Sequence, residues 1–142
     1  MRLQSAIFTV EDTLAGHEDA AKVLSILKME GVWLYAVTAL AREDAERILR
    51  ETGTAEHFRG LLTAGETHCP LDKGEIYAKA MRRLRSEQRD TIVFAGRLAG
   101  LRAAKRAGFR TAAVAGAAGA AEWEEMCREA AETVENYRDF LA

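Results

Sequence analysis

The sequence is poor in cysteine and histidine, the residues that form disulfides and most often bind zinc. It has two cysteines and three histidines among 142 residues. Cys69 and Cys127 stand far apart and outside any C-x-x-C pattern, so we expect reduced, unpaired thiols. The histidines share neither a helical face nor a short ligand spacing, so we expect no zinc site from them.

A strong net charge and long apolar runs are also missing. The formal net charge is −2 at pH 7, whereas nucleic-acid binding needs a concentrated basic face. No apolar run approaches the roughly 20 residues that span a bilayer. Polar residues from Thr9 onward come too early for a secretory signal. We therefore expect a cytoplasmic protein that binds neither nucleic acid nor membrane.

Composition and length favour one folded domain. Hydrophobic residues make up 49% of the sequence and charged residues 30%, which is typical of a globular chain with a single core. The only proline is Pro70, and no repeat or interdomain linker is visible. We expect a single domain over residues 1–142.

Short apolar runs alternate with amphipathic segments along the chain. The runs predict strands, and the amphipathic segments predict helices. This alternation favours an α/β, three-layer Rossmann-like fold, with a parallel sheet of about five strands and helices on both faces. The expected strands are 3–10, 32–38, 60–64, 90–96 and 109–116, with a last short strand at Thr133-Val134, and the expected helices are 18–31, 42–53, 72–87, 98–108 and one in the tail from residue 122.

Four segments, taken in order, carry a family resemblance. AIFTVEDTL (6–14) and LYAVTAL (34–40) end the first two expected strands. CPLDKGEIY (69–77) leads into a helix, and VFAGRLAGLRAAKRAGFRTAAV (93–114) spans a strand, a helix and the next strand. Together they resemble the four motifs of the haloacid dehalogenase (HAD) superfamily, nearest to its phosphatase and phosphoglucomutase-like members. The resemblance implies a HAD-like fold, and the segments between the strands are too short for a cap domain.

The catalytic positions differ from the family pattern. The resemblance places Thr9 at the nucleophilic aspartate, Glu11 at the acid/base aspartate and Asp12 at a glycine, while Ala95 and Gly96 replace the acidic pair of the fourth motif. In the family, the first aspartate attacks phosphorus, and with the fourth-motif acid it holds magnesium, a cation that takes oxygen ligands. These replacements imply that aspartyl-phosphate chemistry has been lost. No metal ion or other cofactor is expected.

Other residues of the resemblance predict an anion site. Thr13 matches the first motif, and Thr38 ends the second expected strand. Lys73 stands two residues closer to the helix than the family's lysine, and Arg97 offers a bidentate donor. Free N–H groups at the helix start, residues 96–98, would favour a phosphate.

Three functions remain open at this point. The first is a binding or regulatory module, with a protein partner or a small phosphorylated ligand, and homo-oligomers are compatible with it. The second is a phosphohydrolase with a rearranged site, in which Glu11 and Asp12 act with magnesium; Glu11 would lie on the same side of an extended strand as Thr9 and serve as its base. The third is an oligomer building block with a vestigial pocket. The missing acids at Ala95 and Gly96 favour the first.

Overall fold

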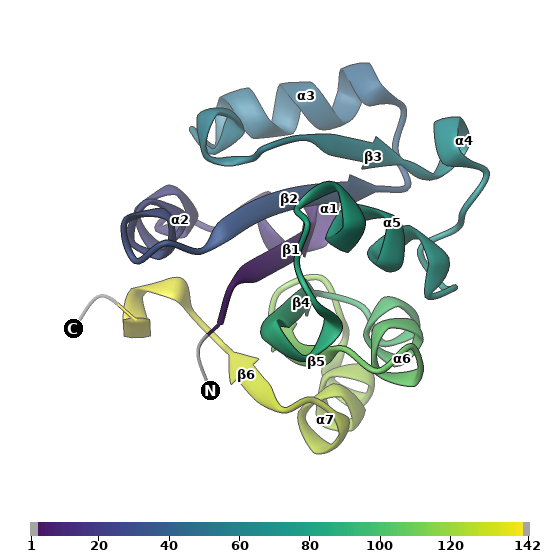
Figure 1. Cartoon of the computed structure of the whole chain (residues 1–142). Coiled ribbons are helices and arrows are strands. Elements are labelled where there is room, and N and C mark those ends of the chain that lie inside the picture. The colour runs from purple at the N-terminus through teal and green to yellow at the C-terminus, as the bar shows by residue number, and fades with distance from the viewer. Residues whose placement is uncertain (1–2, 141–142) are drawn as a thin grey trace.

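The computed structural model describes residues 3–140, which build one parallel sheet with helices against both of its faces (Figure 1). The sheet has six strands in the order β3-β2-β1-β4-β5-β6. The strands are β1 (Ser5–Thr9), β2 (Trp33–Thr38), β3 (Leu61–Thr63), β4 (Thr91–Ala95), β5 (Arg110–Val114) and β6 (Glu132–Val134). The helices are α1 (Val10–Thr13), α2 (Ala20–Met29), α3 (Arg42–Glu51), α4 (Ala64–Thr67), α5 (Glu75–Arg83), α6 (Leu98–Arg106) and α7 (Ala120–Glu129), with 3-10 turns η1 (Ala55–His57), η2 (Gln88–Asp90) and η3 (Tyr137–Phe140).

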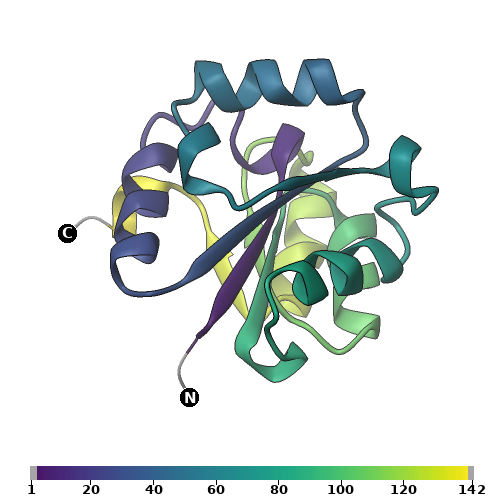
Figure 2. The same ribbon diagram turned by 45° about the horizontal axis from the view of Figure 1, so that its top comes forward.

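The order of the strands reverses in the middle of the sheet, between β1 and β4. From β1 the chain proceeds outward through β2 to β3, then returns to β4 on the other side of β1 and proceeds through β5 to β6. Figure 2 shows β1 in the middle of the molecule. All five pairings are parallel, so the carboxyl ends of β1 and β4 lie side by side. Such a reversal point is where ligands bind in open α/β sheets.

Each face of the sheet packs against its own set of helices. On one face, α2, α3 and η3 cover a core in which the Phe8 ring stacks on the Phe94 ring, with 4.3 Å between ring centroids. Phe58 meets Phe8 edge-on at 5.9 Å. On the other face, α5, α6 and α7 pack over residues such as Ile7 and Val93. The near-continuous burial of β1 and β4 follows from this double cover.

The expected fold class is confirmed, with one strand more than about five. The sixth is β6, which contains the short strand expected at Thr133-Val134. The segments between strands in residues 3–140 hold helices of ten residues or fewer, and none of them forms a cap domain. No helix in this range is long and apolar enough to cross a membrane.

Three local features differ from expectation. The first strand ends at Thr9, and residues 10–13 form the helical turn α1, in which the Thr13 hydroxyl donates to the Thr9 carbonyl at 2.6 Å. The short helix α4 was not expected, because a single turn leaves no periodic pattern. Helix α7 begins at Ala120, two residues before the expected start of the tail helix at residue 122.

The turn η3 packs against α1 at the other end of the sequence. Tyr137 is 2% exposed, and its hydroxyl donates to the Thr13 carbonyl at 2.9 Å. The His17 ring meets the Tyr137 ring edge-on at 5.2 Å. This turn therefore closes the core on the α2 face of β1.

We predict that Phe8→Ala lowers the free energy of unfolding by about 3–5 kcal/mol, because it removes a fully buried ring from the centre of one core. Chemical denaturation followed by circular dichroism measures the change. Met29→Ala is the control, because the Met29 side chain is 84% exposed, and we expect a change within about 0.5 kcal/mol. A loss below about 1 kcal/mol for Phe8→Ala would contradict the central place of this ring.

Candidate functional site

A pocket of about 420 Å³ lies at the carboxyl ends of β1 and β4, where the strand order reverses. We call it the strand-end pocket. Its lining includes Thr9, Glu11, Asp12, Leu71, Tyr77 and Arg97. Four of the residues predicted from the sequence therefore meet here, at the edge where ligands of such folds bind.

Asp12 folds back over the end of β1. The Thr9 hydroxyl donates to the Asp12 carboxylate and lies 3.3 Å from the Phe94 carbonyl. The backbone N–H of Gly96 donates to the same carboxylate at 3.2 Å. Asp12 thus joins the ends of the two central strands and does not simply face water.

Gly96 leaves the room that this arrangement needs. A Cβ atom placed on Gly96 would lie 2.2 Å from the Asp12 carbonyl oxygen and 2.8 Å from the Asp12 Cβ. Real Cβ atoms do not approach backbone atoms so closely, so any side chain at position 96 would displace α1. Asp12 can therefore lie over the end of β1 only because residue 96 has no side chain, and for the same reason no carboxylate could stand at position 96 while Asp12 stays there.

The surroundings of Asp12 favour its protonated form. Burial, the largest cause, and the nearby charge of Glu11 both raise the pKa of the Asp12 carboxyl. The hydrogen bonds from Thr9 and Gly96 act in the opposite direction, because they stabilise the carboxylate. Burial outweighs them, so the net result is a pKa of Asp12 raised to about 6.

Glu11 is bound to the end of β2. Its carboxylate accepts a hydrogen bond from the Thr38 hydroxyl at 2.7 Å and another from the Ala39 N–H at 2.9 Å. The expectation that Glu11 lies on the same side of an extended strand as Thr9 is wrong, because the strand ends at Thr9 and Glu11 belongs to the helical turn α1. Thr38 therefore enters the site as a partner of Glu11.

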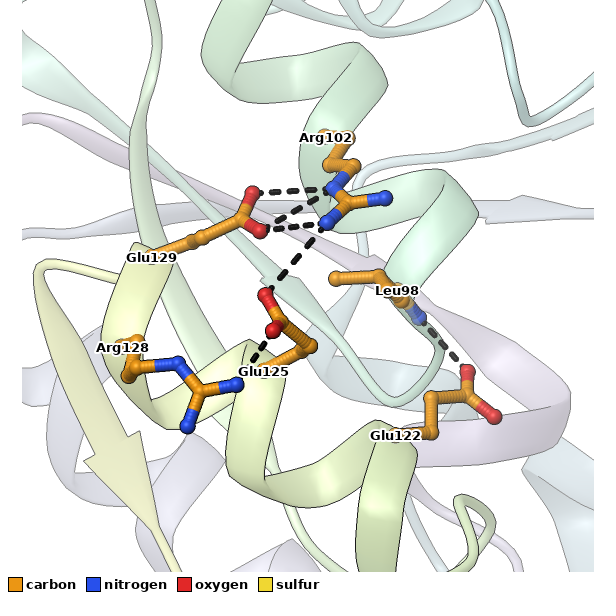
Figure 3. Close-up of polar contacts among 6 residues, drawn as sticks. All are labelled: Leu98, Arg102, Glu122, Glu125, Arg128 and Glu129. Carbon is orange, nitrogen blue, oxygen red and sulfur yellow. Dashed lines mark hydrogen bonds and ion pairs between the residues drawn. The ribbon is translucent and has the colours of Figure 1, made fainter.

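The start of α6 is occupied by a carboxylate from α7. Glu122 accepts a hydrogen bond from the Leu98 N–H at 2.8 Å (Figure 3) and another from the Arg97 Nε at 2.9 Å. The Arg97 guanidinium holds the pKa of Glu122 below its usual range, and the Leu98 N–H acts in the same direction. Two of the three N–H groups expected to be free at residues 96–98 thus already donate, Gly96 to Asp12 and Leu98 to Glu122.

Further ion pairs hold α7 alongside α6 (Figure 3). The Arg102 guanidinium lies 2.6 Å from a Glu129 oxygen and 3.5 Å from a Glu125 oxygen. Arg128 pairs with Glu125 on the same helix. Exposed ion pairs contribute little individually, but this row and the apolar contacts of Met126 fix α7 so that Glu122 reaches the start of α6.

Three predicted residues do not line the strand-end pocket, namely Thr38, which contacts it only through Glu11, and Thr13 and Lys73. Thr13 is fully buried, and its hydroxyl donates to the Thr9 carbonyl within α1. Lys73 is exposed in the turn before α5 and does not line the pocket. Within residues 3–140 its side chain forms no ion pair.

Sequence reasoning missed Glu122 and Tyr77. Glu122 follows Leu98 by 24 residues, and the only available signal is the helical spacing of three and four that it shares with Glu125 and Glu129. Tyr77 lines the pocket and its hydroxyl donates to the Leu71 carbonyl at 2.6 Å. Burial raises the pKa of Tyr77 well above its usual value, so this hydroxyl stays protonated.

The residues at this edge do not fit the magnesium ion of the resembled family. Thr9 offers a neutral hydroxyl, and Ala95 and Gly96 offer no side-chain oxygen. Magnesium in proteins normally keeps several waters and is held by one or two carboxylates, and the two at this edge, of Glu11 and Asp12, already accept hydrogen bonds from other groups of the chain. In the part of the chain that the structure describes, no group of three or more His, Cys, Asp or Glu side chains is placed to hold a metal ion.

Comparison with known proteins agrees with this architecture. A family model for haloacid dehalogenase-like hydrolases matches residues 3–108. Similar solved structures include a dehalogenase, with a TM-score of 0.75 and 19% identity over 91% of this chain and 56% of that chain. A β-phosphoglucomutase from Clostridium difficile has a TM-score of 0.68 and 19% identity, over 93% of this chain and 54% of that one. A predicted phosphoglycolate phosphatase from Haemophilus somnus has a TM-score of 0.74 and 15% identity, over 88% and 55%.

These likenesses concern the fold. The chain spans about half the length of the solved structures that it matches, as their covered shares show. No curated protein matches its sequence.

We predict that Gly96→Ala lowers the free energy of unfolding by about 1–3 kcal/mol, because the added methyl group collides with the Asp12 backbone. Thermal and chemical denaturation measure the loss. Gly65→Ala is the matched control, since no atom lies within 4 Å of its added Cβ, and we expect equal or slightly higher stability. Equal effects of the two substitutions would contradict the close packing of Gly96 on Asp12.

We also predict that Asp12→Asn removes a pH dependence of stability. The carboxyl pKa is about 6 in the folded chain against 3.8 for an unperturbed aspartate, so protonation favours the folded state as the pH falls from 8 to 4. The variant should be more stable than the wild type by about 1–3 kcal/mol at pH 8, and the difference should vanish near pH 4. Unfolding free energies across this range test it, with Glu43→Gln as an exposed control. A constant difference would exclude titration of Asp12 as the cause.

Proposed function

The chain belongs to the haloacid dehalogenase-like hydrolase family, and we propose that it is a binding or regulatory module in which aspartyl-phosphate chemistry has been lost. We further propose that residues 1–142 form a single domain located in the cytoplasm. One observation supports it above all. Three backbone N–H groups at the strand-end pocket donate to carboxylates of the chain itself. The donors are Ala39, Gly96 and Leu98, and the acceptors are Glu11, Asp12 and Glu122.

These carboxylates oppose a phosphate at this edge. Two like unit charges about 4 Å apart near a protein surface repel each other by about 4 kcal/mol, and a phosphate would also have to displace the carboxylates from their N–H donors. Arg97 offers no free charge in return, because its guanidinium is paired with Glu122. The phosphate site expected from Thr13, Thr38, Lys73 and Arg97 is therefore not part of the proposal.

The nucleophile position supports the same conclusion. The Thr9 hydroxyl is 1% exposed and donates to the Asp12 carboxylate. A threonine hydroxyl is a weak nucleophile unless a base takes its proton, and Glu11 is engaged with Thr38 and Ala39 instead. A partner at this edge would be a protein or a ligand without a phosphate group.

One observation favours a second function, a phosphohydrolase with a rearranged site. Asp12 could take the proton that the Thr9 hydroxyl already donates to it. Its pKa of about 6 lies in the range at which carboxylates act as general acids or bases near neutral pH. This alternative needs Asp12 in its ionised form and a substrate that reaches Thr9.

We predict that the wild-type chain does not hydrolyse p-nitrophenyl phosphate above the rate of Asp12→Asn or Glu11→Gln, with or without added magnesium. The reason is that no carboxylate stands at Thr9, Ala95 or Gly96 to form the aspartyl phosphate or to hold the metal ion. Steady-state release of p-nitrophenol measures it. Turnover that is lost in Asp12→Asn while the variant remains folded would establish the rearranged phosphohydrolase and refute the proposal.

A further inference from the structure

A second pocket lies away from the strand ends, between β3, α4 and one face of α5. It has a volume of about 460 Å³ and is lined by Leu62, Glu66, Thr67, Lys79, Arg82 and Arg83. We call it the α5 basic pocket. It shares no lining residue with the strand-end pocket, and its volume is in the range of small-molecule sites. Figure 1 shows α4 and α5 together on one side of the molecule.

The three cations of this pocket belong to one face of one helix. Lys79, Arg82 and Arg83 are spaced three and four residues apart in α5, so their side chains are neighbours on the helix surface. Like charges at this spacing destabilise a helix. Among residues 3–140, none of the three side chains forms a hydrogen bond or an ion pair. The arginines Arg97 and Arg102 of α6, by contrast, are paired with glutamates of α7.

The acidic residue of the pocket does not neutralise them. Glu66 is held by Arg42, whose Nη2 lies 2.8 Å from one carboxylate oxygen and whose Nε lies 3.1 Å from both. The charge of Glu66 is thus matched from α3. Among residues 3–140, the three cations of the pocket therefore have no anionic side chain paired with them, in a chain whose formal net charge is −2.

Its chemistry suits a phosphate-bearing small molecule. Two guanidinium groups and an ammonium group on adjacent turns can each donate to a different oxygen of a multiply charged oxyanion. Leu62, which is 6% exposed, adds an apolar wall for the rest of such a molecule. Three cations are too few for a nucleic-acid footprint.

We propose that the α5 basic pocket binds a small, multiply charged phosphate compound through Lys79, Arg82 and Arg83. This site is separate from the strand-end pocket and does not rest on the function proposed for it. Phosphate recognition in this chain would then occur on the surface of α5, beside the sheet edge at β3.

Isothermal titration calorimetry with pyrophosphate tests the proposal. The wild-type chain should bind at low ionic strength, and Arg82→Gln/Arg83→Gln should bind at least about tenfold more weakly, because both forked donors are lost. The matched control is Lys105→Gln/Arg106→Gln. It removes the same charge from exposed positions of α6 outside the pocket, and its affinity should stay within about twofold of the wild type. Glutamine favours helices, so both variants should keep the wild-type circular dichroism spectrum.

Three results would overturn the proposal. The first is that the wild type does not bind pyrophosphate, and the second is that both double variants lose affinity equally. The third is that a deca-glutamate peptide binds the wild type more tightly than pyrophosphate does and loses this affinity in Arg82→Gln/Arg83→Gln. The last would assign the surface to an acidic protein partner. Arg82 and Arg83 do not line the strand-end pocket, so failure of the function proposed for that pocket leaves this test unaffected.

Discussion

The parallel pairing of β1 with β4 is the interaction on which the rest of the structure depends. It joins Ser5 to Thr91, whose hydroxyls lie 2.8 Å apart across 86 residues of sequence. It also stacks Phe8 on Phe94, so the same pairing defines the core beneath α2 and α3. Because the two halves of the sheet diverge from this pair, the ends of both strands open onto one edge, and that edge becomes the place where polar groups collect.

Backbone N–H groups at this edge need acceptors, since a buried donor without one is costly. Here the acceptors are carboxylates of the chain. Asp12 takes the Gly96 N–H, and the lack of a side chain at Gly96 gives Asp12 its space. Glu122 of α7 accepts the Leu98 N–H. The ion pair between Arg102 of α6 and Glu129 of α7 helps to hold the two helices together. Residues that look like separate departures from a family pattern thus form one coupled arrangement.

The sequence predicted the sheet well because its strands are continuous apolar runs that are buried on both faces, as Ile7 and Phe8 illustrate, since these neighbours belong to the cores on opposite faces. The family resemblance pointed to Thr9, Glu11 and Asp12, and all three line the strand-end pocket. Their hydrogen bonds could not be predicted, since one turn of helix from residue 10 changes the direction of every following side chain. The contact of Glu122 with Leu98 could not be predicted for another reason, because it depends on how α6 and α7 pack against each other.

The contact between Tyr137 and Thr13 constrains the order in which the chain can fold. Its hydrogen bond spans 124 residues, and the β1–β4 pairing is also remote in sequence. Contacts of such separation form late and slow folding, because a long loop must close before they stabilise anything. During synthesis, the apolar faces of β1 and α1 therefore stay incompletely covered until β4, and then residue 137, has been synthesised. That interval is when the chain is most exposed to aggregation, because unpaired strand edges and apolar surface are then accessible.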